Sequence, residues 1–282
     1  MTTSSSATSS STATILPDAG ALLALARWRN ALIAAIGVYV AAWWAARNAT
    51  HPATLAAALA AIALTGYANT FNDLADVAID RRAHPERPLA RGTLQPRAAQ
   101  WFAALLAALG IGLAFIARPS LGILSVAVVA AMTLYSTTLA SLPLIGNVAV
   151  AVLASLPFFY GAVTVGDARA GLTLLGVAVP LHLARELSKS LDDADADAPY
   201  RRTLPIAFGR GAARVLVALS VALFAWRLLD LASPQPRLRM LVIPALALCV
   251  IATRRALAGR TGAPLLFKSA MLAAMAALVV AR

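Results

Sequence analysis

Residues 51–80, HPATLAAALAAIALTGYANTFNDLADVAID, join an apolar segment directly to an amide and three carboxylates. In residues 51–71 the only polar side chains are hydroxyls, one amide and one histidine. A helix of about 20 such residues crosses about 30 Å of hydrocarbon. The stretch therefore predicts a membrane-spanning helix that carries a polar site at its end.

The whole chain has the same character. Of its 282 residues 60% are hydrophobic and only 13% are charged, with a mean hydropathy of +0.77. The charged share is about half that of a typical globular protein. We expect residues 20–282 to form one all-α, polytopic transmembrane domain. Nine apolar segments are long enough to span, centred near Val38, Ala60, Leu109, Val128, Leu153, Val177, Val217, Leu246 and Ala274.

The two remaining features of composition are the N-terminus and the single cysteine. Residues 1–19, MTTSSSATSSSTATILPDA, are rich in Ser and Thr, and we expect a disordered tail there. They do not read as a signal peptide, because no basic region precedes an apolar run. Cys249 lies inside an apolar segment, so a disulfide framework is excluded and a packing role is expected.

The net charge of +12 could suggest a nucleic-acid partner. However, the basic residues are spread over loops instead of forming a stripe, so we expect no nucleic acid. Most of the 24 Lys and Arg residues fall before the first span or after even-numbered spans. The positive-inside rule then predicts a cell-membrane protein whose N-terminus and acidic segments face the cytoplasm.

Nine of the 12 acidic residues lie in two windows. They could simply be solvated charges that balance the arginines. The similarity between the two windows argues against that explanation, because shifting the sequence by 117 positions aligns several Asp, Pro and Gly residues of one window with those of the other. The chain is therefore expected to have two pseudo-repeated halves that present similar acidic segments to a common site. The aligned pairs are Asp76 with Asp193, Asp80 with Asp197, Pro88 with Pro205, and Gly92 with Gly209.

Helical spacing predicts what these segments bind. Asn72, Asp76 and Asp80 share one helix face, and so do Arg185, Lys189, Asp193 and Asp197. Stacked oxygen ligands without a His or Cys cluster favour a hard cation such as Mg²⁺, which also takes phosphate oxygens. The sequence thus indicates a phosphorylated substrate. The basic residues placed to bind it are Arg87, Lys189, Arg201 and Arg202.

A substrate for this site should have a phosphorylated head for the acidic end and a hydrocarbon tail for the apolar bundle. An allylic prenyl diphosphate has both. Ionising its C1–O bond gives a diphosphate leaving group and an allylic cation. Metal ions stabilise the first. A dry apolar cavity protects the second from water.

The motifs resemble those of the UbiA-type intramembrane prenyltransferases. The family's N-D-x-x-D-x-x-x-D segment matches residues 72–80, followed by Arg87, Pro88, Leu89 and Gly92. A second acidic segment, RELSKSLDDADAD at 185–197, precedes TLPIAFG. Residues 27–43 and 134–161 are similar to the branch that makes digeranylgeranylglyceryl phosphate in ether-lipid synthesis.

The resemblance implies nine helices around a central cavity open laterally to lipid. It implies Mg²⁺ held by Asn72 and Asp76 on one side and by Asp193 and Asp197 on the other, supported by Asp73 and Asp80. Arg87 and Lys189 would contact the diphosphate, and these two with Asp76, Asp193 and Asp197 would carry catalysis.

Other polar residues match cavity-facing positions of the family. Arg27 and Asn30 begin the first span, and Tyr135 ends the fourth. Each has a plainer explanation: a snorkelling arginine, a helix-packing amide and an interfacial tyrosine. His84 and His182 could serve as acid or base, or could have no such role.

Two positions depart from the family pattern. Ser190 stands where the second segment normally begins with Asp, and Ala140 stands where the family often has Lys. The first departure is expected to weaken metal binding, and the second removes a diphosphate contact. Arg185 or Arg201 could compensate.

The leading hypothesis is transfer of a geranylgeranyl group from its diphosphate to geranylgeranylglyceryl phosphate. An aromatic quinone precursor or a tetrapyrrole would use the same metal site. A transporter is the alternative of another class, but transporter acids tend to lie inside spans, whereas these lie at span ends. The sequence leaves the oligomeric state open.

Overall fold

The computed structural model describes residues 18–281, and the predicted tail lies outside them except for its last two residues. Asp18 accepts a hydrogen bond from the Gly20 backbone N–H at 2.9 Å and so caps the first helix. The helices are α1 (Ala19–Ala26), α2 (Trp28–Ala46), α3 (Pro52–Ala75), α4 (Val77–Ala83), α5 (Pro88–Arg91), α6 (Pro96–Ala117), α7 (Pro119–Thr137), α8 (Ile145–Thr164), α9 (Ala168–Asp197), α10 (Leu204–Ala232), α11 (Pro236–Leu241), α12 (Ile243–Leu257) and α13 (Ala263–Ala281), with a 3₁₀ turn at Leu139–Ser141.

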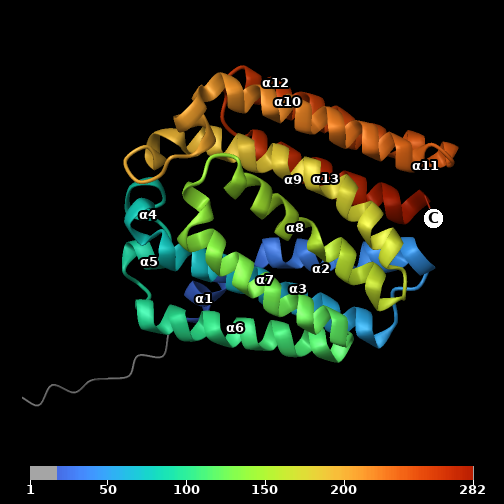
Figure 1. Ribbon diagram of the computed structural model, residues 1–282, viewed down its shortest axis with the longest axis horizontal. Helices are drawn as coiled ribbons and strands as arrows, with labels where there is room; N and C mark the ends of the chain where they lie inside the picture. The colour runs from blue at the N-terminus through green and yellow to red at the C-terminus, as the bar shows by residue number, and fades with distance from the viewer. Residues whose placement is uncertain (1–17, 282) are drawn as a thin grey trace, which may run out of the picture.

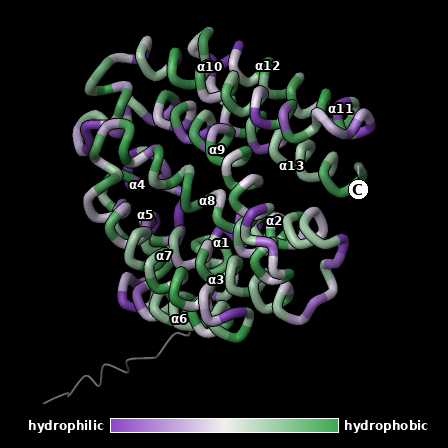
Figure 2. The backbone as a smooth tube through the Cα atoms, turned by 45° about the vertical axis from the view of Figure 1, so that its right-hand side comes forward, coloured by the Kyte–Doolittle hydropathy of each residue, from purple (hydrophilic) through white to green (hydrophobic). Residues whose placement is uncertain are grey.

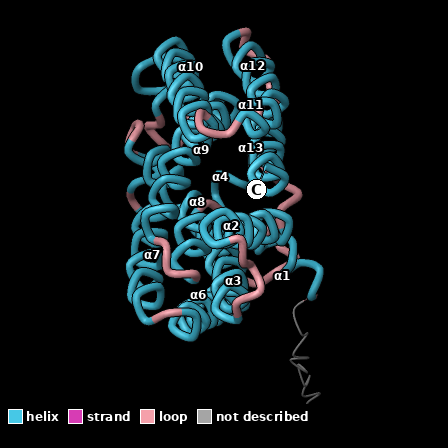
Figure 3. The backbone as a smooth tube through the Cα atoms, turned by 90° about the vertical axis from the view of Figure 1, so that its right-hand side faces the viewer, coloured by secondary structure: helices cyan, strands magenta, loops and turns pink. Residues whose placement is uncertain are grey.

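Nine helical segments within residues 18–281 are long and apolar enough to cross a membrane. Eight are single helices, and the ninth combines α11 and α12 over Pro236–Leu257. Figure 3 shows only helices and loops in the described chain. The prediction of an all-α, multi-pass membrane protein with nine spans is confirmed.

The helices form two groups on either side of α8 (Figure 1). One group contains α2, α3, α6 and α7, and small side chains such as Ala57 and Ala60 fill its core. The other contains α9, α10, α12 and α13, packed around larger side chains such as Phe224 and Phe267. The helix α8 packs against both α2 and α9, and so connects the two groups.

The contact between α2 and α8 is close. A Cβ atom added to Gly161 in α8 would lie 1.9 Å from the Val38 carbonyl oxygen in α2. Only glycine fits there, and the two backbones therefore touch without an intervening side chain. This contact holds two walls of the bundle at a fixed separation.

The acidic segments lie at one end of the bundle. Helices α4 and α5 and the connection from α9 to α10 meet at the left of Figure 1, where Figure 2 shows hydrophilic stretches. Gly92 and Gly209, which the sequence aligns, both have positive φ, at 78° and 85°. Glycine adopts this conformation without steric cost. Each therefore allows the chain to turn after its acidic segment, although Gly209 lies within α10.

Candidate active site

The spacing predicted one continuous helix for the first acidic segment, but the structure breaks it at Asp76. Helix α3 ends at Ala75, Asp76 has φ −99° and ψ 7°, and α4 resumes at Val77. Two backbone hydrogen bonds cross the break, from the Asp76 N–H to the Asn72 carbonyl and from the Asp80 N–H to the Asp76 carbonyl. Because this spacing is kept, the three side chains still reach the same cavity.

The second acidic segment is helical throughout. Helix α9 continues to Asp197, so its acidic residues lie on the helix and not in a loop. Lys189 Nζ lies 3.9 Å from Asp193 Oδ2, one helical turn away. Among the side chains of residues 18–281, the Asp197 carboxylate has no ion-pair partner.

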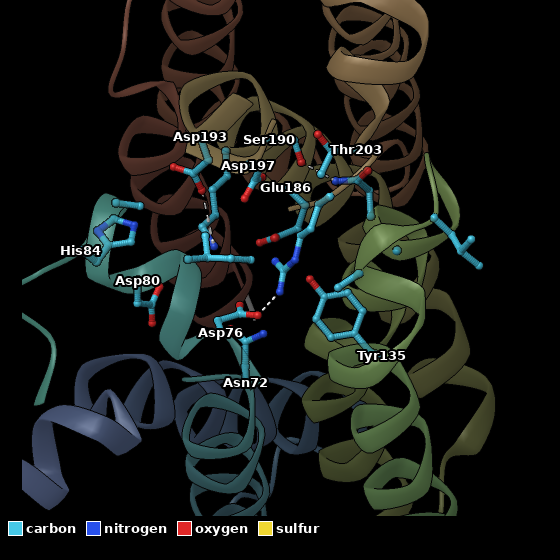
Figure 4. Close-up of a pocket in the computed structure, with 18 of the residues that line it drawn as sticks. Asn72, Asp76, Asp80, His84, Tyr135, Glu186, Ser190, Asp193, Asp197 and Thr203 are labelled. Atoms are coloured by element: carbon cyan, nitrogen blue, oxygen red, sulfur yellow. Dashed lines mark hydrogen bonds and ion pairs between the residues drawn. The ribbon is translucent and has the colours of Figure 1, made fainter. Parts of the chain in front are cut away.

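Both segments line a single polar cavity of about 60 Å³. Figure 4 shows Asp76 and Asp80 on one side of it, and Asp193 and Asp197 on the other. The two segments therefore converge, as the aligned halves predicted. The other lining residues include Asn72, His84, Arg87, Tyr135, Ala140, Asn147, Glu186, Lys189, Ser190, Arg201 and Thr203.

Arg201 joins the two sides of this cavity. It lies in the connection between α9 and α10, and its Nη2 donates a hydrogen bond to Asp76 Oδ1. Burial lowers the pKa of Arg201, but a guanidinium of such high ordinary pKa keeps its charge. The positively charged Arg201 thus pairs with Asp76, which is one of the two proposed metal ligands of the first segment.

Two other arginines hold the remaining carboxylates of the first segment. Arg87 Nη1 donates to Asp80 Oδ1 at 2.7 Å and to Asp73 Oδ1 at 3.3 Å. Arg27 Nη2 donates to the same Asp73 oxygen at 2.5 Å. Asp73 lines neither of the two cavities described, so the structure does not bring it to the predicted metal site. It positions the two arginines instead.

A second, mostly apolar cavity of about 240 Å³ adjoins the polar one. Its apolar lining comes from α2, α7, α8 and α13, with residues such as Ile33, Leu153, Phe158 and Met271. Its polar lining includes Arg27, Asn30, Asn69, His182, Arg185 and Lys268. The two cavities share four lining residues: Asn72, Tyr135, Glu186 and Lys189.

The structure thus brings most of the predicted residues to one or the other cavity. Arg27, Asn30, Tyr135 and Arg185 all line the apolar cavity. Arg202 does not fit the prediction: it is exposed and lines neither cavity, because its neighbour Arg201 is the one that points inward.

The two histidines differ in their surroundings. His84 lines the polar cavity, and its Nδ1 lies 3.4 Å from Glu86 Oε1. His182 is buried in α9 and lines the apolar cavity. Neither arrangement identifies an acid or a base.

Both departures from the family pattern lie in the polar cavity. Ala140 is part of its lining, in the 3₁₀ turn before α8. Ser190 Oγ accepts a hydrogen bond from Asn147 Nδ2 at 2.9 Å. An oxygen acceptor is therefore present at position 190 although the carboxylate is not.

Several polar lining residues were missed by the sequence analysis as site residues, and three of them have polar or charged groups of particular interest. Asn147 lies in the first turn of α8 and donates a hydrogen bond to Ser190. Glu186 lines both cavities and pairs with Arg185. Lys268 is the third, on α13. A signal existed for Lys268, because a lone charge inside an apolar span usually faces the bundle interior.

The oxygen donors of the polar cavity suit Mg²⁺. Carboxylate and amide oxygens are its preferred protein ligands, and it commonly takes only one or two carboxylates, completing its shell with phosphate oxygens and water. The Asp197 carboxylate lines the cavity and forms no ion pair with a Lys or Arg side chain of residues 18–281. No three His, Cys, Asp or Glu side chains of the described chain form a ready-made metal-binding group.

Comparison with known proteins gives the family. The model of the UbiA prenyltransferase family matches residues 34–278. The chain belongs to the UbiA prenyltransferase family. A digeranylgeranylglyceryl phosphate synthase from Methanopyrus kandleri is 36% identical over 250 residues, which are 85% of this chain and 89% of that protein. The sequence analysis preferred a prenyltransferase to a transporter, and this prediction is confirmed.

Solved structures share the fold at lower identity. A UbiA homologue from Aeropyrum pernix superposes with a TM-score of 0.80 at 18% identity, over 90% of this chain and 98% of that one. A homologue from Archaeoglobus fulgidus, solved with DMAPP and Mg²⁺, gives 0.67 at 18% identity, over 92% and 99%. The predicted nine-helix architecture is thus that of the family.

Proposed function

We propose that this prenyltransferase transfers a geranylgeranyl group from geranylgeranyl diphosphate to geranylgeranylglyceryl phosphate, with Mg²⁺ as cofactor. The observation that carries the proposal is the convergence of both acidic segments on one polar cavity that shares a wall with an apolar one. The relative from Methanopyrus kandleri supports the acceptor, and the homologue with bound DMAPP and Mg²⁺ supports the donor and the metal.

In this proposal the polar cavity receives the diphosphate. Asn72 and Asp76 would hold Mg²⁺ on one side, and Asp193 and Asp197 on the other. The ions would neutralise the charge that develops on the leaving diphosphate. The basic residues of the same cavity, Arg87, Lys189 and Arg201, are placed to bind diphosphate oxygens.

Lys189 and Tyr135 mark where the reaction would occur. Both line the two cavities, so they lie between the site for the diphosphate and the apolar space. A donor whose diphosphate lies in the polar cavity would place its C1 atom near this boundary. An ammonium group there is positioned to bind the diphosphate oxygen that leaves C1.

The transfer then exchanges one carbon–oxygen bond for another. The C1–O bond of the donor breaks and its electron pair stays on the diphosphate. The free hydroxyl oxygen of the acceptor bonds to C1, and its proton passes to the departing diphosphate. The apolar lining, with Phe158 and Leu153, keeps water from the allylic cation.

The apolar cavity is smaller than the two hydrocarbon chains together. Pockets that enclose a drug-sized ligand hold about 300–1,000 Å³, and this one holds about 240 Å³. We therefore infer that the isoprenoid tails extend beyond it between the helices into lipid.

The orientation in the cell membrane is also proposed, with the N-terminus and the acidic end in the cytoplasm. The Lys and Arg bias supports it. In a Cys249→Ala background, single cysteines introduced as Arg202→Cys at the acidic end and Arg237→Cys at the opposite end test it. A membrane-impermeant maleimide added to intact cells should label the second and not the first, and the reverse pattern would invert the orientation.

The function itself is tested by incubating purified protein with radiolabelled geranylgeranyl diphosphate, Mg²⁺ and single acceptors. The panel contains geranylgeranylglyceryl phosphate, an aromatic quinone precursor and a tetrapyrrole. We expect a Mg²⁺-dependent ether-linked product with the first. Transfer only to one of the others would reject the proposed acceptor and keep the prenyl transfer.

A further inference from the structure

Lys268 is a charged residue in an otherwise apolar span. Helix α13, APLLFKSAMLAAMAALVVA, contains no other charged side chain. A charge inside a membrane span is costly and marks a functional position unless it is paired. Lys268 is half-buried and lines the apolar cavity, so it faces the interior of the bundle.

No carboxylate of residues 18–281 pairs with Lys268. Its Nζ donates one hydrogen bond, at 2.7 Å to Asn30 Oδ1 in α2. An ammonium group has three donors. Two of them are therefore left without a described protein partner beside a cavity.

Two other positive charges act on this ammonium group. Arg185 lines the same cavity from α9, and the charges of Arg185 and Arg29 both act on Lys268. The ion-pair partner of Arg185 is the adjacent Glu186. Like charges gathered at the edge of a low-dielectric space repel one another. A bound anion would relieve that repulsion.

The position of this cluster differs from that of the diphosphate site. Arg185 precedes Asp193 by eight residues, which is about 12 Å along a helix. The residues shared by the two cavities, such as Tyr135 and Lys189, lie between the two charged regions. An anion held by Lys268 would thus lie in the apolar cavity, on the other side of the donor C1 atom from the diphosphate.

We propose that Lys268 and Arg185, with Asn30 holding Lys268 in place, bind the phosphate monoester of the acceptor lipid at a site separate from the diphosphate site. This inference rests on the proposed function, and it names the residues that select a phosphorylated acceptor. Lys268 and Arg185 donate to phosphate oxygens, and Asn30 orients the ammonium group.

Such a site discriminates between classes of acceptor. A phosphorylated acceptor neutralises the cluster when it binds. A neutral acceptor would enter the same apolar space but leave Lys268 without a counter-charge, and binding that leaves buried polar groups unpaired is strongly disfavoured. The two substrates also keep their anionic heads apart, because each has its own set of basic residues.

The decisive experiment compares Lys268→Gln with the wild type on two acceptors, geranylgeranylglyceryl phosphate and geranylgeranylglycerol, its dephosphorylated form. We expect the KM for the phosphorylated acceptor to rise about tenfold or more. The KM for geranylgeranyl diphosphate should stay the same. The preference for the phosphorylated over the neutral acceptor, as a ratio of kcat/KM, should fall by a similar factor.

Three further variants make the result specific. Lys268→Arg keeps the charge and should retain most of the preference. Asn30→Asp places a carboxylate beside Lys268 and should weaken binding of the phosphorylated acceptor as Lys268→Gln does. Arg237→Gln removes an exposed positive charge at the opposite end and should change neither KM. An unchanged preference in both Lys268→Gln and Asn30→Asp would overturn the proposal, as would an equal rise in the KM of the donor.

Thermal unfolding without donor separates this inference from the proposed function. Geranylgeranylglyceryl phosphate should stabilise the wild type more than Lys268→Gln, even if no transfer to it occurs. Equal stabilisation by phosphatidic acid would assign the cluster to membrane phospholipid and reject the acceptor site. Failure of transfer together with selective stabilisation would reject the proposed reaction and keep the anion site.

Discussion

Arg201 and Asp76 form an ion pair across the polar cavity although 125 residues separate them along the chain. Asp76 belongs to the first acidic segment, and Arg201 follows the second. The pair therefore ties the two halves together at the point where both contribute to the proposed diphosphate site. It also means that a metal ion must compete with a guanidinium group for Asp76.

This competition predicts opposite effects of Arg201→Gln on the two ligands of the site. Mg²⁺ alone should bind more tightly, because Asp76 is no longer neutralised. The KM for geranylgeranyl diphosphate should rise about tenfold, because a charge-assisted hydrogen bond is lost. Spectroscopic titration with Mn²⁺ measures the effect on metal binding, and steady-state kinetics measure the effect on the KM. Arg202→Gln is the matched control, since this neighbouring arginine is exposed and lines neither cavity.

Replacing the carboxylates should stop the reaction without unfolding the protein. We expect Asp76→Ala and Asp197→Ala each to lower kcat at least about a hundredfold, because the charge on the leaving diphosphate is no longer stabilised. Product formation and a size-exclusion profile in detergent are the measurements. Asp195→Ala is the control, because that carboxylate is 93% exposed and pairs with Arg210 away from the cavities. Full activity of either variant would remove its residue from the mechanism.

Ser190→Asp should restore the carboxylate that the family normally has. The Asn147 amide already donates to the Ser190 hydroxyl, and a carboxylate oxygen can accept the same hydrogen bond. We expect activity to be unchanged or higher, with less Mg²⁺ needed for half-maximal rate. A Mg²⁺ titration of both proteins tests this. A large loss of activity would show that the hydroxyl has a function of its own.

Arg87→Met should destabilise the protein more than a surface change does. The Asp80 side chain is 5% exposed and forms its ion pair with Arg87, so the variant leaves a buried charge unpaired. The cost of such a loss is about 3–5 kcal/mol. Thermal unfolding in detergent should show a lower Tm, which Arg87→Met combined with Asp80→Asn should partly recover. The same substitution at exposed Arg91 in α5 should have little effect.

The fold followed closely from hydropathy, because each span must satisfy its own backbone hydrogen bonds and needs enough apolar residues to cross the bilayer. The alignment of Asp76 with Asp193 also predicted a shared site. Local spacing could not show which cation from another helix reaches each carboxylate. Asp73 was therefore assigned to a metal although it binds Arg27 and Arg87, and Lys268 was not assigned at all.

The contact between Gly161 and the Val38 carbonyl limits how this enzyme can be re-engineered for bulkier acceptors. Smaller side chains at this contact would give no extra room, because the two backbones already touch there without an intervening side chain. The lining from α13 includes Met271 and Met275, whose unbranched thioether side chains adapt their shape readily. Acceptor scope is therefore expected to widen through substitutions on α13, while the seam between α2 and α8 stays rigid.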